Sequence, residues 1–100
     1  MLEHIPRIVS AEVIGKTELV VHFDNGVDKV YDVAPLLTRP QFQLLRTPAF
    51  FAALRVDVGG YGISWNDDID ISEYEIWTNG KGLSERSLQP TLQRGQGVAP

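Results

Sequence analysis

The sequence contains no cysteine among its 100 residues. This absence excludes disulfide bonds, thiolate catalysis and the zinc or iron–sulfur sites that depend on cysteine ligands. The chain also has no apolar run near the roughly 20 residues that a membrane-spanning helix needs. Its first residues, MLEHIPRIVS, have neither the basic start nor the apolar core of a secretory signal peptide. We therefore expect a cytoplasmic protein that makes no membrane contact.

Motifs of well-known catalytic sites are missing as well. There is no glycine-rich phosphate loop, no HExxH, no G-x-S-x-G and no Cys/His framework. No serine lies in a recognisable nucleophile context, and no basic helix–turn–helix pattern is present. These absences favour a protein that is not an enzyme, and we expect no cofactor.

Charge of positive sign is scarce, since 9 basic residues stand against 13 acidic ones and the net charge is −4. The imbalance is concentrated in residues 1–79, which hold 12 acids and 6 bases, whereas residues 80–100 hold 1 acid and 3 bases. Proteins that bind nucleic acid gain much of their affinity by neutralising phosphates. The acidic balance therefore argues against nucleic acid and favours a basic partner.

Apolar alternation predicts three strands in the first third of the chain, at residues 7–14, 17–23 and 27–33. In the second of them Leu19, Val21 and Phe23 alternate with polar or smaller neighbours and are expected to face the core. Asn25-Gly26 predicts a two-residue hairpin turn between the second and third strands. Short connections favour neighbouring strands, so we expect an antiparallel meander.

Proline and capping residues predict short helices after the meander. Asp32 is placed to cap a helical turn at 34–37, and Thr47 to cap a helix from Pro48 to about residue 54. Ser72 and Glu75 fit a capping box for a helix that runs to about residue 79 and ends at a left-handed Gly80. Between these helices, Gly59-Gly60 predicts a second hairpin from strands at 55–58 and 61–65.

These elements predict an α+β fold, made of an antiparallel β-meander with a second short hairpin and two or three short helices in a single small domain. We expect a compact domain over residues 1–79 and a flexible or loosely docked tail over 80–100, because the tail is rich in Gly, Ser, Gln and Pro. A domain of this size has a small core, which favours a homo-oligomer.

The segment 66–75 is the most acidic part of the chain. It contains Asp67, Asp68, Asp70, Glu73 and Glu75 and no basic residue. Carboxylate and amide oxygens suit magnesium or calcium, although the spacing lacks the glycine and distal glutamate of a calcium loop. The same residues fit a solvated loop that complements the start of a helix, or a contact with a partner. The sequence leaves these three interpretations open.

Histidine and aromatic residues are the other candidates for a site. His22 is expected to be a half-exposed strand residue. Asp24 is on the same face of the strand but lies roughly 6–7 Å away along it, which is too far for a direct hydrogen bond. Tyr61 and Trp65 lie on the same face of the strand predicted at 61–65, and the next helix carries Tyr74 and Trp77. Such aromatics form either the core or a recognition patch.

Four stretches resemble, in order, the small prokaryotic family known as domain of unknown function 2442. They are I-x-S-x-E-V near the start, LVVHFDNGVDKVYDVAPLL, PAFFAALRVD and ISWNDDIDIS, and together they cover about residues 5–79. The usual family version of the last stretch has a glycine where this chain has Asp68. The resemblance implies a compact α+β domain without an assigned activity. Neighbouring genes and relatives with a helix–turn–helix imply a regulatory context and a toxin–antitoxin-like pairing.

We expect a non-enzymatic interaction domain that pairs with itself or with a small basic protein. The contact would use an exposed sheet edge or the acidic segment, with a set of candidate partner-binding residues: Trp65, Asn66, Asp67, Asp68 and Asp70. The alternative is a divalent-metal or small-ligand binding protein or enzyme that uses the 66–75 segment, with Asn66, Asp67, Asp70 and His22 as ligands. DNA-based regulation fits some relatives of the family but not the charge of this chain.

Overall fold

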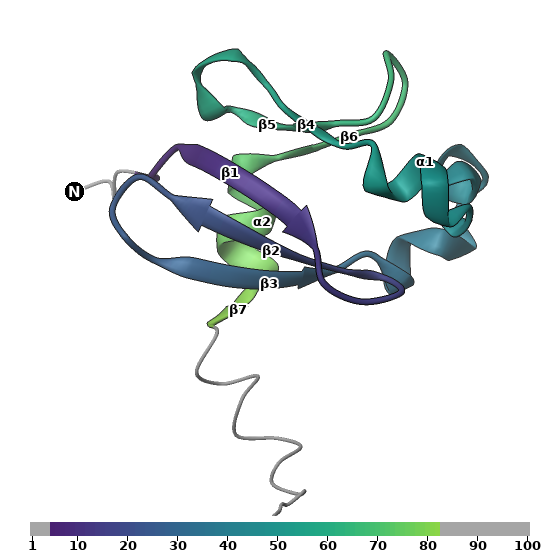
Figure 1. The fold of residues 1–100 in the computed structure, drawn as a ribbon, viewed down its shortest axis with the longest axis horizontal. Helices are drawn as coiled ribbons and strands as arrows, with labels where there is room; N and C mark the ends of the chain where they lie inside the picture. The colour runs from purple at the N-terminus through teal and green to yellow at the C-terminus, as the bar shows by residue number, and fades with distance from the viewer. Residues whose placement is uncertain (1–4, 83–100) are drawn as a thin grey trace, which may run out of the picture.

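Two antiparallel sheets and several short helices make up residues 5–82, the part of the chain that the computed structural model describes (Figure 1). The first sheet has the order β1-β2-β3-β7 and the second the order β4-β5-β6. The strands are β1 (Ile8–Val13), β2 (Glu18–Phe23), β3 (Asp28–Asp32), β4 (Arg55–Val56), β5 (Gly62–Ser64), β6 (Asp70–Ser72) and β7 (Lys81–Gly82). The helices are α1 (Pro48–Ala52) and α2 (Glu73–Asn79), with 3₁₀ turns η1 (Ala34–Thr38), η2 (Pro40–Arg46) and η3 (Val58–Gly60). The predicted α+β class, with its meander and second hairpin, is confirmed.

The turn between β2 and β3 is one residue longer than predicted. The register pairs His22 with Asp28, so that three residues, 24–26, form the loop. The N–H of Phe23 donates to the carbonyl of Val27 at 2.9 Å and closes this loop. Gly26 adopts a φ of 88°, the left-handed conformation that ends a three-residue hairpin loop. The sequence signal therefore located the hairpin correctly but not its loop length.

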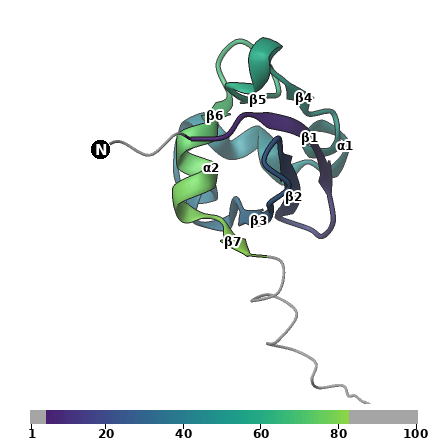
Figure 2. The same ribbon diagram turned by 90° about the vertical axis from the view of Figure 1, so that its left-hand side faces the viewer.

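One face of the first sheet forms the core. Leu19, Val21 and Phe23 of β2 are buried, as the alternation predicts. They share a single cluster with residues of the second sheet and α2, among them Ile63, Trp65, Ile69, Ile71 and Ile76. Figure 2 shows α2 and the second sheet on two sides of the meander. Burial of each large side chain stabilises the fold by about 1.5–3 kcal/mol, so this cluster holds the two sheets together.

The strand β6 was not predicted from the sequence. It lies within the acidic segment and pairs with β5, with Ile63 opposite Ile71. Ile69 and Ile71 are buried, whereas Asp70 between them is exposed. This alternation spans only a few residues between carboxylates, which is too short for a pattern signal to stand out.

The predicted helix ends are confirmed in part. Pro48 begins α1, but the side chain of Thr47 makes no capping hydrogen bond. At α2 the hydroxyl of Ser72 accepts from the N–H of Glu75 at 3.1 Å, as the capping box predicts. Gly80 is extended, with φ −73° and ψ 158°, so the predicted left-handed stop is wrong.

Because the chain leaves α2 in an extended conformation, residues 81–82 reach the first sheet and pair with β3 as β7. They fall within the predicted tail 80–100, whose remaining residues, 83–100, lie outside the described part of the chain. Between η1 and α1, residues Pro40–Arg46 form the 3₁₀ turn η2. Within residues 5–82, no helix is long and apolar enough to cross a membrane.

A pair of glycine substitutions tests how tightly the hairpin of the second sheet packs on the first. Gly60 has φ +76°, and a Cβ there would lie 2.5 Å from the carbonyl oxygen of Ile8. Gly26 has φ +88°, but a Cβ there would meet nothing within 4 Å. We expect Gly26→Ala to cost about 1 kcal/mol of unfolding free energy from backbone strain alone. Gly60→Ala should cost about 1–3 kcal/mol more, because backbone must also move.

Urea unfolding of both variants measures this difference. Equal losses for the two substitutions would contradict the close approach of Gly60 to β1.

Candidate functional site

The acidic segment begins with a tight loop between β5 and β6, at the upper right of Figure 1. The side-chain oxygen of Asn66 accepts hydrogen bonds from the N–H groups of Asp68 and Ile69, each at 2.8 Å. The N–H of Trp65 donates to the carbonyl of Ile69 at 2.9 Å and closes the loop. An asparagine side chain that bonds to the backbone two residues on stabilises a turn. This loop therefore has a defined conformation.

Trp65 anchors the acidic loop in the core and is 7% exposed. Its indole N–H donates to the carbonyl of Phe51 at 2.8 Å, and its ring stacks on the Phe51 ring at a centroid distance of 6.1 Å. Trp77, the other tryptophan, is partly buried and meets Phe23 edge-on at 5.1 Å. Both tryptophans therefore pack on the core, whereas the two tyrosines of the same set, Tyr61 and Tyr74, are exposed.

Three of the four remaining candidate residues present carboxylates to solvent. Asp67, Asp68 and Asp70 are exposed, while Asn66 is half-buried. Within residues 5–82, none of these three carboxylates forms an ion pair. Asp67 and Asp68 lie in the loop, and Asp70 lies on β6. Three exposed carboxylates therefore lie on the hairpin that β5 and β6 form.

The proposed metal ligands are not brought together in the same way. His22 belongs to the first sheet, where its Nδ1 lies 2.8 Å from Asp28 and its Nε2 lies 3.8 Å from Glu12. Asn66 uses its side-chain oxygen on backbone N–H groups. In the described part of the chain, no group of three or more His, Asp or Glu side chains is arranged to hold a metal ion.

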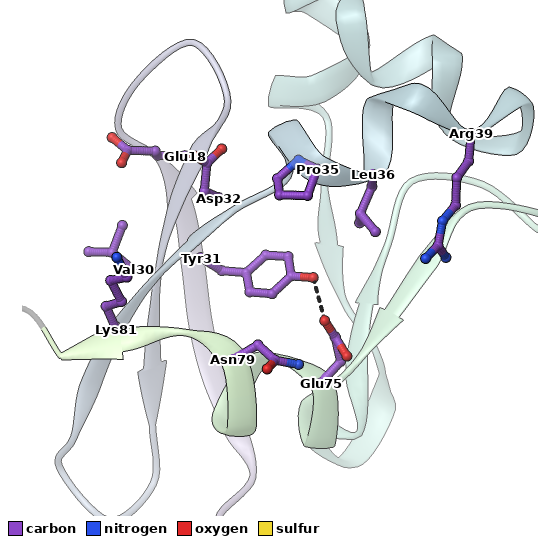
Figure 3. A pocket seen from close by; sticks show the side chains of 10 residues that line it. All are labelled: Glu18, Val30, Tyr31, Asp32, Pro35, Leu36, Arg39, Glu75, Asn79 and Lys81. Atoms are coloured by element: carbon purple, nitrogen blue, oxygen red, sulfur yellow. Dashed lines mark hydrogen bonds between the residues drawn. The ribbon is translucent and has the colours of Figure 1, made fainter.

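A groove next to the acidic segment is the concave feature that sequence reasoning missed (Figure 3). It consists of two adjoining pockets of about 590 and 250 Å³, which share Tyr31, Leu36, Arg39 and Glu75. We call this combined space the groove. The other residues that line it are Glu18, Val30, Asp32, Pro35, Phe42, Asp70, Ile71, Ser72, Asn79 and Lys81.

At the centre of the groove, the hydroxyl of Tyr31 donates a hydrogen bond of 2.8 Å to Glu75 Oε2. Burial and the neighbouring Glu75 carboxylate raise the pKa of the Tyr31 phenol above its ordinary value. Tyr31 therefore remains protonated and keeps its role as a donor. Glu75 was predicted to reach back to the start of α2, and that expectation is wrong because its carboxylate contacts β3 instead.

The groove is acidic overall. Four carboxylates line it, from Glu18, Asp32, Asp70 and Glu75, against the two cations of Arg39 and Lys81. Figure 3 shows Arg39 and Lys81 on opposite sides of Tyr31, so the centre of the groove lies between two positive ends. Two of the carboxylates, Asp70 and Glu75, belong to the acidic segment. The acidic segment therefore forms one part of the groove wall, and β3 and η1 form another.

Removing the phenol hydroxyl tests the Tyr31–Glu75 contact. We expect Tyr31→Phe to lower the unfolding free energy by about 1–2 kcal/mol at neutral pH, because a half-buried carboxylate loses its donor. The folded state raises the pKa of Tyr31, so its contribution is present below the ordinary value of about 10 and is lost as the pH rises above it.

Urea unfolding at pH 8 and at a pH above about 10 measures both effects. Wild type should lose more stability than Tyr31→Phe across this interval, and an equal loss in the two proteins would contradict the assignment. Tyr74→Phe provides the control, because this exposed tyrosine has no such partner in the described part of the chain.

Comparison with known proteins identifies a family for this chain. No curated protein and no solved structure matches the chain. The model of a family described as proteins of unknown function, DUF2442, matches residues 8–82, which are most of the chain and nearly all of its described part. The resemblance noted in the sequence is thereby confirmed, and the chain belongs to the DUF2442 family.

Proposed function

We propose that this protein is a non-enzymatic interaction module that binds a small basic protein through its acidic hairpin. The observation that carries the proposal is the exposure of Asp67, Asp68 and Asp70 on a conformationally defined hairpin without ion pairs inside the described chain. Carboxylates that no internal cation neutralises attract a positively charged partner.

The rigidity of the loop supports this proposal. Trp65 is anchored to Phe51, and Asn66 holds the backbone of the following residues. A preformed loop loses little conformational freedom when it binds, so more of the interaction energy contributes to affinity. The overall net charge of −4 adds long-range attraction for a basic partner and repels nucleic acid.

Metal or ligand chemistry at the acidic segment has less support. His22 contacts Glu12 and Asp28 rather than the loop, and Asn66 already accepts two backbone hydrogen bonds. Self-association remains an outcome that the experiment must detect. Sedimentation of the purified chain at several concentrations distinguishes a homo-oligomer from a monomer whose partner is a different protein.

Charge reversal in the loop tests the proposal. The tagged full-length chain is used to capture proteins from its host's lysate, and the stoichiometric partner is then purified for titration calorimetry. We expect the double variant Asp67→Lys/Asp68→Lys to weaken binding at least about tenfold, and the triple variant with Asp70→Lys to weaken it further. Far-ultraviolet circular dichroism should remain that of the wild type, because these side chains are exposed.

The matched control, Glu12→Lys/Asp24→Lys, makes the same change in net charge on the meander, where Glu12 and Asp24 are exposed. It should leave the affinity within about twofold of the wild type apart from long-range effects, which added salt screens. If the control weakens binding as much as the loop variant, or if neither variant does, the acidic loop is not the interface.

A further inference from the structure

We infer that the groove is the docking site for an extended, basic segment of the partner, which adds as a strand and places a Lys or Arg side chain against Glu75 and Asp70. This inference rests on the proposed function and specifies how the partner is recognised. The groove shares these two carboxylates with the acidic segment, so one bound chain can contact both.

The edge of β3 is open where the groove begins. The N–H of Val33 donates to the carbonyl of Thr17, the residue before β2, so the backbone groups of its neighbour Asp32 point away from β2. The strand β7 covers this edge only as far as Val30. Beyond it the chain has turned into α2, and the described residues offer Asp32 no strand partner on that side.

The edge of β6 is open in the same way. The N–H of Glu73 donates to the carbonyl of Tyr61, and hydrogen-bonded positions alternate along an antiparallel pair. The backbone groups of Ser72 and Asp70 therefore point away from β5. Both residues line the groove, and β6 is the last strand of its sheet in the described chain. Unpaired backbone groups along a strand edge favour an extended polypeptide over a compact small molecule.

Glu75 and Asp70 outnumber Arg39, the cation that lines both pockets, so this part of the groove has a net negative charge that favours a long cationic side chain. The Tyr31 ring and Leu36 supply an apolar surface for an aliphatic stem (Figure 3). Glu75 Oε2 accepts from Tyr31, which holds the carboxylate in place and leaves the other oxygen without a hydrogen bond in the described chain. Asp70 provides a second carboxylate. A Lys or Arg side chain can pack its aliphatic stem on this apolar surface and place its charged head group against the two carboxylates.

The test uses defined peptides and the full-length chain. The probes are fluorescent, amidated hexapeptides in which valine alternates with arginine, and the same peptides with glutamate in place of arginine. We expect fluorescence anisotropy to show saturable binding of the arginine peptide and no binding of the glutamate peptide. Glu75→Gln/Asp70→Asn should weaken it about tenfold, because both charge-assisted contacts are lost. Glu75→Gln keeps an oxygen that accepts from Tyr31, so the fold is retained.

The matched control, Asp67→Asn/Asp68→Asn, removes the same charge from the loop outside the groove and should change peptide affinity less than about twofold. Amide hydrogen exchange gives a second readout, since strand addition must protect the N–H groups of Asp32 or Asp70. If the two double variants weaken the peptide equally, or if neither amide is protected, binding is unspecific charge attraction and the inference is overturned.

The purified partner separates this inference from the proposed function. If the partner loses affinity for Asp67→Lys/Asp68→Lys but keeps it for Glu75→Gln/Asp70→Asn, the groove is not the docking site. The proposed interaction through the acidic hairpin is then retained. A partner whose affinity changes with neither variant overturns both.

Discussion

The indole of Trp65 stacks on Phe51 and donates its N–H to the Phe51 carbonyl, and the second sheet depends on this contact. Trp65 is at the end of β5, and Ile69, also buried, precedes β6. With both ends of the loop held in the core, the residues between them have to turn in the solvent. The polar stretch that results is acidic because Asp67 and Asp68 occupy it. Core packing thus determines where the charge is displayed.

A second contact, from Tyr31 to Glu75, ties β3 to α2 and forms the floor of the groove. This contact can form because α2 starts directly after β6. Ser72 caps the helix, which places Glu75 in its first turn. The same short stretch of chain therefore provides the exposed loop, a strand edge and a groove carboxylate. The acidic segment therefore contributes residues both to an exposed loop and to the groove.

Local patterns predicted much of the fold. Alternation identified β2 and its buried face, Asn25-Gly26 located the hairpin, and Ser72 marked the start of α2. The features that form the groove depend on residues far apart in the sequence, such as Tyr31 and Glu75, which are 44 positions apart. No local propensity relates two such positions. Trp65 illustrates the same limit, because alternation groups it with Tyr61, which is exposed, and only tertiary packing distinguishes the two.

The most direct test of the proposed acidic interaction surface is to map the complex on the protein itself. Amide chemical shifts of the isotope-labelled, full-length chain would be recorded with and without the unlabelled partner. We expect changes concentrated at residues 66–72 and along the groove at Asp32 and Glu75, with the meander face that carries Glu12 and His22 unchanged. Changes centred on that meander face, with residues 66–72 unaffected, would show that the acidic segment is not the binding surface.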